Sequence, residues 1–587
     1  MSSVSEGVSR HAEAPRWLRH VLRFLALGIA ALHTFVAVRR QSMNEDGVNY
    51  LDIGTAYMNG DWQTAINAIW SPLYSWIVGA VIHLAQPSVW WEFPVVQMTN
   101  FGIFAAALIC FEFFWRQLTQ RYYNDSEGVT AIARFPPAGW WVVGYSLFIW
   151  SSLNLIEMWA VTPDMCVAAL VYLAAGMLFR LSRRDATPRA ALMLGVVLAT
   201  GYLAKAVLFP LGIVAIMLAG IIRGSSLGSA SRILLTLASF VIVAVPYLIV
   251  LSIATGHVTF GEVGRFTYMK HVNGLEYPHW TRTLEQVDGA PEHGPRRVFE
   301  RPAVYTFAEP IGGTYPLSFD PSYWTQGLVP RIDAARQLRA LIANAQFYFN
   351  LFVREQGGFA VIALLLILIT VASSGRPQLF SPEMALVAWS LSAFGVYALV
   401  YAEGRYVAPF VVLFWSGLLA AIKFPDLAPY RRLATIGGVI LAMVVWVNIG
   451  VLNVQGLAAL LGVSVEPAGS RVASQNNQFG DRPSGNPAEI ASGLLRLGLK
   501  QGDHVGFIGY SFAAFWARLA RVRIVAEVEP SEAENFWKAD RQTQSRVLHA
   551  FSSAGATAVV AQGGPSTFVP SGWLAVGETG YLVHFVR

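Results

Sequence analysis

The first three quarters of the chain alternate long apolar runs with short polar connections. A basic segment, residues 1–19, precedes an apolar run at 21–38, and no Ala-x-Ala cleavage site follows that run. We therefore expect an uncleaved first span with a cytoplasmic N-terminus, because a spanning helix needs about 20 predominantly apolar residues. Further apolar runs predict spans at 72–86, 94–115, 139–153, 163–180, 191–222, 233–254, 351–373, 383–401, 406–422 and 432–454.

The run at 191–222 is too long for a single span. Its 32 residues contain one charge, Lys205, and at about 1.5 Å per residue a helix of that length outruns a bilayer core of about 30 Å. We expect two short spans that meet between Gly201 and Pro210. The chain ends are expected on opposite sides although the segments are even in number, so one span between 72 and 153 is missed or misassigned.

Arginines in the connections indicate the orientation. The connection 180–189 carries four arginines, which places it in the cytoplasm by the positive-inside rule. Lys205 and the segments 41–71 and 401–409 then lie on the outer side. The long outer segment 255–346 is aromatic and Gly-rich, exceeds a plain connection, and is expected to be an acceptor-binding lid. Its histidines lack the spacing of a helical metal site; they are His257, His271, His279 and His293.

Residues 465–587 follow a different pattern, in which short apolar strands alternate with helical segments. The pattern predicts strands at 503–509, 522–528, 556–561 and 581–586, and helices at 511–519 and 534–552. Such alternation predicts a small soluble α/β domain, suited to holding the acceptor or a partner protein. Its turn Gly506-x-x-Gly509 lacks the rest of the dinucleotide fingerprint, which argues against nucleotide binding.

Composition supports a membrane protein. Of 587 residues 55% are hydrophobic and 13% are charged, about half the charged fraction of a soluble domain, and the mean hydropathy is +0.46. The net charge of +6 comes from arginines in short connections, so it does not indicate nucleic-acid binding. Cys110 and Cys166 lie in apolar runs and are expected to be core residues. We therefore predict a polytopic α-helical membrane protein with about eleven to thirteen spans over residues 20–455.

Charged residues at the outer membrane edge are the candidates for chemistry. Three carboxylates, Glu45, Asp46 and Asp52, fall within eight residues after the first apolar run. Each has a structural alternative, since a loop carboxylate is usually only solvated. Further candidates have alternatives as helix N-terminal charge or as snorkelling anchors; they are Asp164 after Thr162-Pro163, Lys205, and Arg405 within Tyr401–Pro409.

Together these charges form a stronger case, because charges at the membrane edge are costly and favour a functional hypothesis with a partner. An acid can deprotonate an acceptor hydroxyl, and cations can stabilise the charge that grows on a departing phosphate. Two acids and two cations are therefore what transfer from a lipid phosphate requires.

The order of these motifs resembles the GT-C glycosyltransferases, especially the branch with protein O-mannosyltransferases and bacterial lipid A aminoarabinose transferases. The resemblance covers residues 20–455. Its motifs are Glu45-Asp46-Gly47-Val48-Asn49-Tyr50, Ser71-Pro72-Leu73-Tyr74, Thr162-Pro163-Asp164, Tyr202-Leu203-Ala204-Lys205, and Gly404-Arg405-Tyr406 with Pro409. The Trp-Trp-Asp sequence of oligosaccharyltransferases is absent, because Trp90-Trp91 precedes Glu92 and Trp140-Trp141 precedes Val142. This argues against an N-glycosylation enzyme.

The resemblance implies an inverting transfer of a sugar from a polyprenyl-phosphate donor to an envelope acceptor, which could be lipid, glycan or protein. It implies Asp46 as base and Asp164 as a second acid, with Lys205, Arg405 and Tyr406 at the donor. The family often has Asp-Glu at the base, whereas Gly47 follows Asp46 here. This leaves the second acid's role open among three residues, namely Glu45, Asp52 and Glu157. A divalent metal near these acids is compatible with the resemblance.

The sequence leaves two other classes open. A transporter or flippase of lipid-linked glycans could line a path with the same charges, and a non-catalytic envelope scaffold could bind without turnover. An enzyme is favoured because the acids lie in an outer segment, no two-fold repeat is evident, and a large outer domain follows. We expect a bacterial inner-membrane protein, surrounded by membrane lipids, with its active site and C-terminal domain facing the periplasm.

Overall fold

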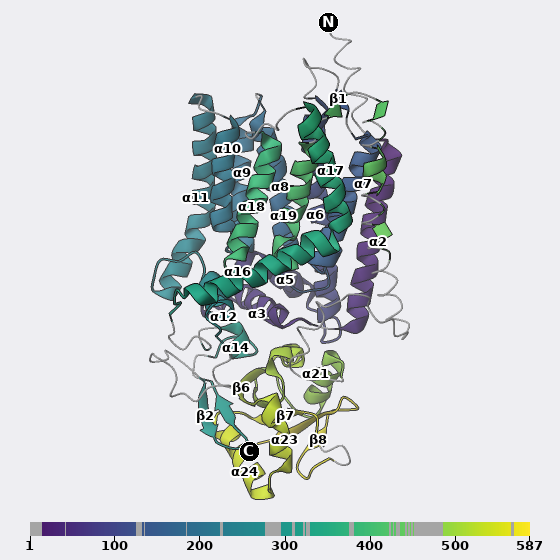
Figure 1. Cartoon of the computed structure of the whole chain (residues 1–587). Helices are drawn as coiled ribbons and strands as arrows, with labels where there is room; N and C mark the ends of the chain where they lie inside the picture. Colours follow the sequence, from purple (N-terminus) through teal and green to yellow (C-terminus); the bar gives the residue numbers. More distant parts are fainter. Residues whose placement is uncertain are drawn as a thin grey trace.

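A computed structural model gives the fold of the chain (Figure 1). It describes residues 14–41, 43–124, 132–133, 135–183, 185–223, 227–275, 295–307, 311–320, 323, 329–374, 381–421, scattered positions between 424 and 450, 485–564 and 569–586. Much of the span expected at 432–454 lies outside the described residues, as do His279 and His293.

A bundle of helices makes up the N-terminal three quarters of the chain (Figure 1). In the part of the chain that the structure describes, four helices are long and apolar enough to cross a membrane. They are α2 (Arg16–Arg40), α6 (Glu92–Asn124), α8 (Asp164–Ser182) and α11 (Leu227–Thr255). The other bundle helices are α5 (Pro72–Ala85), α7 (Pro137–Trp150), α9 (Pro188–Ala204), α10 (Leu208–Arg223), α17 (Gly357–Ser374), α18 (Pro382–Ala398) and α19 (Gly404–Ala420). This confirms a mostly helical protein with membrane-spanning segments.

The long apolar run at 191–222 breaks where it was expected to break. Helix α9 ends at Ala204, Lys205 is extended (φ −157°, ψ 126°), and α10 begins at Leu208. Lys205 therefore sits at a gap between two helices, where its side chain can leave the apolar bundle.

The acidic segment 41–71 is largely helical rather than an irregular loop. Helix α3 (Glu45–Asn59) begins directly after Asn44 and is followed by the short α4 (Trp62–Ala65). Glu45 and Asp46 occupy the first turn of α3, where the helix dipole favours negative charge. Helix α3 crosses α5 with backbones in close contact, since a Cβ added to Gly54 would lie 2.6 Å from the Ser75 carbonyl oxygen.

The C-terminal part forms a sheet of seven strands in the order β2-β3-β6-β5-β7-β9-β8, in which β5 is parallel to β6 and β7. The strands are β2 (Arg296–Phe299), β3 (Val304–Thr306), β5 (His504–Ile508), β6 (Arg523–Val528), β7 (Ala558–Gln562), β8 (Leu574–Ala575) and β9 (Tyr581–Phe585). Its helices are α21 (Pro487–Arg496), α22 (Phe515–Ala520), α23 (Pro530–Lys538) and α24 (Arg541–Ser553). We call residues 485–586 together with β2 and β3 the sheet domain.

Two details of the sheet domain differ from the sequence pattern. The single helix expected at 534–552 is two helices, because the Asp540 side chain accepts a hydrogen bond from the Thr543 amide and caps a new helix there. Strands β2 and β3 come from the long segment 255–346, and β3 pairs with β6. That segment is therefore built into the sheet as well as into the bundle.

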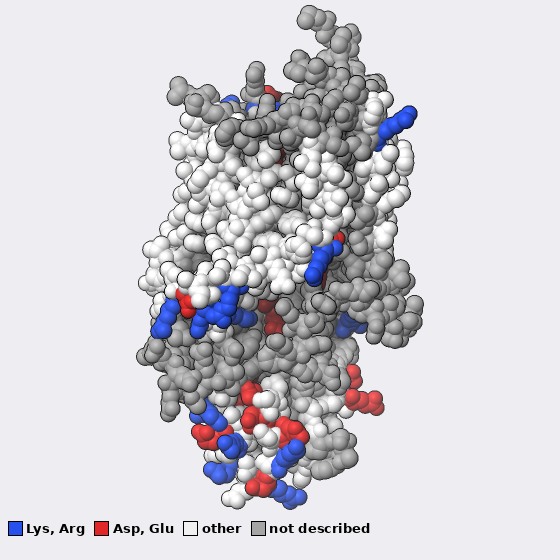
Figure 2. Space-filling view, viewed as in Figure 1, with Lys and Arg blue, Asp and Glu red and all other residues white. Residues whose placement is uncertain are grey.

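Charge separates the two parts of the molecule. The visible face of the bundle shows few Lys, Arg, Asp or Glu side chains among its described residues, whereas the sheet domain shows many of both signs (Figure 2). An uncharged belt is what a lipid-facing surface requires. Helix α3 lies at the end of the bundle that meets the sheet domain (Figure 1).

Candidate active site

Three chain segments meet around the N-terminus of α3. The Asn44 side chain accepts a hydrogen bond from the Val161 amide at 2.7 Å, which ties the start of α3 to the turn before α8. This brings Asp46, in the first turn of α3, towards Asp164, in the first turn of α8. The third segment is the start of α19, which carries Arg405.

Arg405 lies between carboxylates from all three segments. Its Nη1 is 3.1 Å from Asp46 Oδ2 and 3.9 Å from Asp164 Oδ2. Its Nε donates a hydrogen bond to Glu403 Oε1 at 3.1 Å. Arg405 and Asp46, which are 359 positions apart in the sequence, are therefore in direct contact.

Lys205 completes this group from the gap between α9 and α10. Its Nζ donates to Asp164 Oδ1 at 2.6 Å and lies 3.7 Å from the centre of the Tyr406 ring. Tyr406 in turn stacks on Tyr397, with ring centroids 5.4 Å apart. A carboxylate and an aromatic face together fix the ammonium group. We call Asp46, Asp164, Lys205, Glu403 and Arg405 the Arg405 cluster.

The Arg405 cluster is partly exposed to solvent and incompletely hydrogen-bonded. The side chains of Asp46, Arg405 and Lys205 are 34%, 21% and 20% exposed, whereas that of Asp164 is 2% exposed. Among the described residues, Asp164 Oδ2 has no hydrogen-bond partner, and 3.9 Å is too far for one to Arg405. Arg405, Lys205 and Asp46 are therefore partly accessible to a polar ligand, while the buried Asp164 Oδ2 keeps an unused acceptor position among the described residues.

Glu157 lies beside this cluster, in the turn between the helical segments 151–155 and α8. Its backbone is in the left-handed region, with φ +55°. Burial raises the pKa of the Glu157 carboxyl, the charge of Glu403 raises it further, and Arg405 opposes the shift. Glu157 therefore shares the electrostatic field of Arg405.

Glu45 and Asp52 do not join the cluster, although sequence reasoning grouped them with Asp46. Glu45 accepts a hydrogen bond from the Tyr510 hydroxyl of the sheet domain at 2.6 Å. Asp52 is buried against Arg518 of the same domain, with Nη1 to Oδ1 at 2.9 Å. The helix explains the separation, because positions seven apart share a face whereas positions six apart differ by about 240°.

Sequence reasoning missed several residues of these contacts. Glu403 lies in the highlighted stretch Tyr401–Pro409 but was not singled out. Glu92 was named from the sequence only as the residue after Trp90-Trp91. Its side chain is 2% exposed and is paired with both Arg518 and Arg521. The pairing of Glu92 with Arg518 spans 426 positions and leaves no local signal in the sequence.

The described residues do not form a metal-ligand set. Among them, no group of three or more His, Cys, Asp or Glu side chains is placed to hold an ion. In the Arg405 cluster Asp46 and Asp164 are instead matched with Arg405 and Lys205. The divalent metal considered from the sequence stays a prediction.

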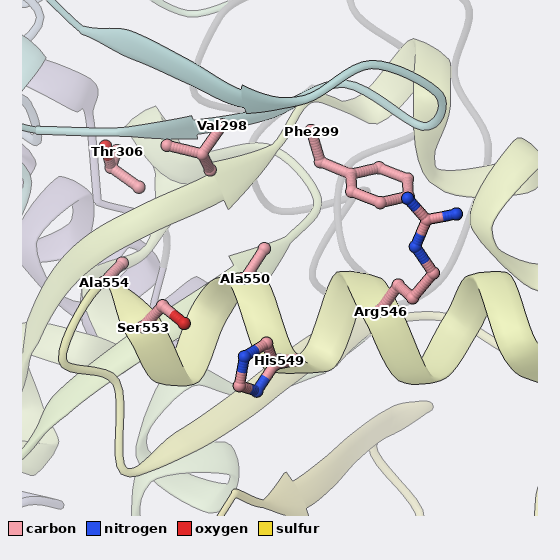
Figure 3. Close-up of a pocket in the computed structure, with 8 residues that line it drawn as sticks. All are labelled: Val298, Phe299, Thr306, Arg546, His549, Ala550, Ser553 and Ala554. Carbon is pink, nitrogen blue, oxygen red and sulfur yellow. The ribbon is translucent and has the colours of Figure 1, made fainter.

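A separate pocket of about 390 Å³ lies on the sheet domain, between the β2–β3 hairpin and α24 (Figure 3). Phe299 and Arg546 face each other there, with the guanidinium 5.4 Å from the ring centre. The lining residues are Val298, Phe299, Thr306, Arg546, His549, Ala550, Ser553 and Ala554. No member of the Arg405 cluster lines this pocket.

Comparison with known proteins gives a similarity of fold. No family model matches the sequence, and no curated protein matches it. The structure of ArnT from Cupriavidus metallidurans bound to undecaprenyl phosphate is similar with a TM-score of 0.51 and 12% identity, over 95% of this chain and 97% of that chain. Its apo form gives a TM-score of 0.47 at 12% identity, over 95% of this chain and 96% of that chain.

An oligosaccharyltransferase from Archaeoglobus fulgidus, in complex with Zn and sulfate, gives a TM-score of 0.42 at 11% identity, over 91% of this chain and 67% of that chain. The similarity to the undecaprenyl phosphate complex of ArnT extends over nearly all of both chains. It confirms the GT-C-like fold that the order of motifs predicted.

Proposed function

We propose that the chain is an integral membrane glycosyltransferase of the GT-C type. It transfers a sugar from a polyprenyl-phosphate donor to an envelope acceptor, which is a lipid, a glycan or a protein. The observation that carries the proposal is the Arg405 cluster, in which two cations and the Asp46 carboxylate, all partly exposed, surround the buried Asp164. We propose about eleven to thirteen spans in a bacterial inner membrane, with the cluster and the sheet domain on the periplasmic side.

The cations are the groups that would hold the donor phosphate. Arg405 can donate two parallel hydrogen bonds to phosphate oxygens, and Lys205 adds a point charge. Asp164 and the Tyr406 ring hold Lys205 in place. Both cations would also stabilise the negative charge that grows on the phosphate as it departs. The ArnT of similar fold was crystallised with undecaprenyl phosphate, which supports a lipid phosphate as the ligand class.

Asp46 is the proposed base. In the structure it is paired with Arg405 through one oxygen, and its side chain is 34% exposed. A donor phosphate that takes over Arg405 would leave the Asp46 carboxylate free to accept the proton of the acceptor hydroxyl. The acceptor oxygen then forms the new glycosidic bond, the bond from the sugar to the phosphate oxygen breaks, and polyprenyl phosphate leaves with the electron pair. Attack opposite the leaving phosphate inverts the anomeric centre.

The remaining predicted site residues take different places in this proposal. Glu157, beside Glu403 and Arg405, is proposed to border the donor site, and Tyr406 to form its wall. Glu45 and Asp52 face the sheet domain, so we propose that they attach α3 to that domain rather than contact substrate. The mechanism has no step through a metal, because no group of three or more His, Cys, Asp or Glu side chains among the described residues is placed to hold one.

The test is release of polyprenyl phosphate by purified protein, measured by mass spectrometry. The protein in detergent is incubated with a pool of polyprenyl-phosphate sugars and crude envelope acceptors. Wild type should release polyprenyl phosphate, and Asp46→Asn should bind donor without releasing it. Asp185→Asn is the matched control, because it makes the same change at a side chain that is 74% exposed in a surface ion pair.

Two outcomes would overturn the proposal. Tight donor binding by wild type without turnover against any acceptor would favour a transporter or scaffold. Release at the wild-type rate by Asp46→Asn would remove Asp46 as the base.

A further inference from the structure

A second group of charges lies where the sheet domain meets the bundle; Asp52, Glu92 and Arg518 in it are buried, whereas the Arg521 side chain is 32% exposed. Arg518, on α22, has a side chain that is 4% exposed. Its Nη1 donates to Asp52 Oδ1 at 2.9 Å, and its Nε donates to Glu92 Oε1 at 3.1 Å. Arg521 donates to the other oxygen of Glu92 at 2.7 Å. We call Asp52, Glu92, Arg518 and Arg521 the Arg518 cluster; its two cations match its two carboxylates.

Every carboxylate oxygen of this cluster has a partner. Asp52 Oδ2 accepts from the Thr314 amide at 2.6 Å, and Oδ1 also accepts from the Thr314 hydroxyl at 3.1 Å. Phe515 packs edge-on against Phe93 beside the charges, with ring centroids 6.0 Å apart. Buried charges are tolerated when they are paired and fully hydrogen-bonded, and they then impose one geometry.

One face of α3 is hydrogen-bonded to the sheet domain and to the long outer segment 255–346. The third arm of Arg518, Nη2, donates to Thr55 Oγ1 at 2.8 Å. Glu45 accepts from the Tyr510 hydroxyl of the sheet domain at 2.6 Å, and Asn49 donates to Ser318 of the long outer segment at 2.8 Å. Positions 45, 49, 52 and 55 recur at the spacing of one helical face. Asp46 lies off this face and points to the Arg405 cluster instead.

Two further contacts fix the pose of α3, beyond the hydrogen bond from the Val161 amide to Asn44 at its start. Its crossing with α5 is one, since a Cβ added to Gly79 would lie 2.5 Å from the Gly54 carbonyl oxygen. A single crossing point still permits rotation about the helix axis and tilting about the contact. The arginine fork on Asp52 and Thr55 removes that freedom, because a planar guanidinium bonded to fixed oxygens holds both distance and orientation.

We propose that Arg518 is a positioning residue for the proposed base. Acting through Asp52 and Thr55, it holds α3 in the rotation and axial position that place Asp46 against Arg405 and the acceptor. The sheet domain is therefore part of the transfer machinery, although it contributes no group to the Arg405 cluster. The proposal rests on the proposed function, because it assigns Asp46 a reaction to perform.

The experiment compares Arg518→Lys and Arg518→Gln with the wild-type full chain in detergent. The first readout is hydrogen exchange of the backbone amides at 45–59, which needs no activity. The second is transfer per folded molecule, resolved into kcat and the KM for donor. Lys538→Gln is the control, because it removes a positive charge from the same domain at an exposed pair with Glu534.

In both variants α3 should lose exchange protection, and kcat should fall by about 10- to 100-fold, since a misplacement of about 1 Å can cost about 100-fold. The donor KM should change by less than about twofold, because neither Arg405 nor Lys205 lies on α3. A merely structural role would lower the folded fraction and leave kcat per folded molecule unchanged. Lys538→Gln should match wild type in both readouts.

Unchanged α3 exchange, or unchanged kcat per folded molecule, would overturn the proposal. If Arg518→Gln does not fold, Arg518→Lys still decides, because it keeps the charge and loses the fork. Failure of the proposed function is recognised separately, as absence of transfer by wild type. In that case loss of α3 protection in the variants would still establish that Arg518 holds α3, and unchanged protection would contradict it.

Discussion

Two arginines in this molecule are each placed between carboxylates, and in both cases one of the carboxylates comes from α3. Arg405 lies between Asp46 and Asp164, and Arg518 lies between Asp52 and Glu92. The Arg405 side chain is 21% exposed and the Arg518 side chain is 4% exposed. The same kinds of charge thus occur in an open and in a closed arrangement.

The difference lies in how completely the charges are bonded. In the Arg518 cluster each carboxylate oxygen has a partner at 3.1 Å or less, so an exchange of partners would leave a buried charge unmatched. In the Arg405 cluster Asp164 Oδ2 has no hydrogen-bond partner among the described residues, and solvent reaches Asp46. A charged side chain that can exchange partners suits ligand binding and proton transfer. A charged side chain whose hydrogen-bonding atoms are all paired suits the attachment of the sheet domain to the bundle.

The comparison is tested most directly by replacing one α3 aspartate in each cluster. Asp46→Asn should lower transfer by about 100- to 10,000-fold, the contribution of a general base. The free energy of unfolding should stay within about 0.5 kcal/mol of wild type, because the residue is partly exposed. Turnover assays and unfolding in detergent measure the two effects. A large loss of stability without loss of turnover would contradict a catalytic role for Asp46 and would indicate a structural role for the Arg405 cluster.

Asp52→Asn makes the same chemical change six residues along α3 and should act mainly on stability. It leaves Arg518 with one carboxylate in a buried place, and breaking such a pair costs about 3 kcal/mol or more. The check is a lower midpoint of unfolding in a denaturant titration of detergent-purified protein. The double variant Asp52→Asn with Arg518→Met should recover much of that loss, because Glu92 keeps Arg521 and the introduced amide oxygen can still accept from Thr314.

The open cluster could be anticipated from the sequence because its members stand at visible boundaries. Asp164 follows a proline at the start of an apolar run, Lys205 interrupts another run, and Arg405 separates two further ones. A charge at the edge of an apolar run needs a partner, so the sequence indicated a shared site. It did not indicate that Glu45 and Asp52 belong elsewhere, because 41–71 was expected to be a loop. With α3 taken as a helix, the spacing of 45, 49, 52 and 55 separates them from Asp46.

The closed cluster could not be anticipated. Arg518 lies 466 positions from Asp52 and 426 from Glu92, and each residue alone is typical of a solvated surface. The same holds for the sheet, where Tyr305 of the long outer segment pairs with Glu527. Local patterns predict elements, whereas contacts between distant polar residues depend on the assembled fold.

A smaller effect should distinguish the two arginines by ligand binding. Arg405→Ala should weaken donor binding by about 10- to 100-fold, the size of about 1.5–3 kcal/mol for hydrogen bonds to a charged group. Lys205→Ala should act in the same direction. Titration of a labelled polyprenyl-phosphate sugar measures the affinity, and Arg183→Ala, at a surface ion pair, is the control. Equal donor affinity in wild type and Arg405→Ala would contradict a phosphate site at Arg405.

Raising the salt concentration sharpens the same contrast. Donor affinity should fall with ionic strength, because Arg405 and Lys205 are partly exposed and exposed charges are screened beyond about 10 Å at 0.1 M salt. The attachment of α3 to the sheet domain, measured by amide exchange, should be nearly independent of salt, because Asp52, Glu92 and Arg518 are buried. Salt-dependent α3 protection would show that this cluster is open to solvent.

The smallest expected effect concerns Glu157, which borders the open cluster. Burial, followed by the charge of Glu403, raises the pKa of its carboxyl above the ordinary value of 4.5. A raised pKa means that folding favours the protonated form, so this contribution to stability is complete below pH 4.5 and is lost as pH rises through the folded-state pKa. Glu157→Gln should remove the loss and flatten the dependence of the unfolding midpoint on pH. Glutamine meets the same backbone cost at φ +55°, so the swap changes the charge alone.

The measurement is the thermal unfolding midpoint of wild type and Glu157→Gln between pH 4 and pH 8, with Glu578→Gln, an exposed residue of the sheet domain, as control. The unfolding midpoint of Glu157→Gln should lie above that of wild type at pH 8, and the difference between the two midpoints should grow with pH. Parallel curves would mean that the Glu157 carboxylate is already neutralised within the fold. In that case Glu157 would resemble the fully paired charges of the Arg518 cluster rather than the charges of the Arg405 cluster.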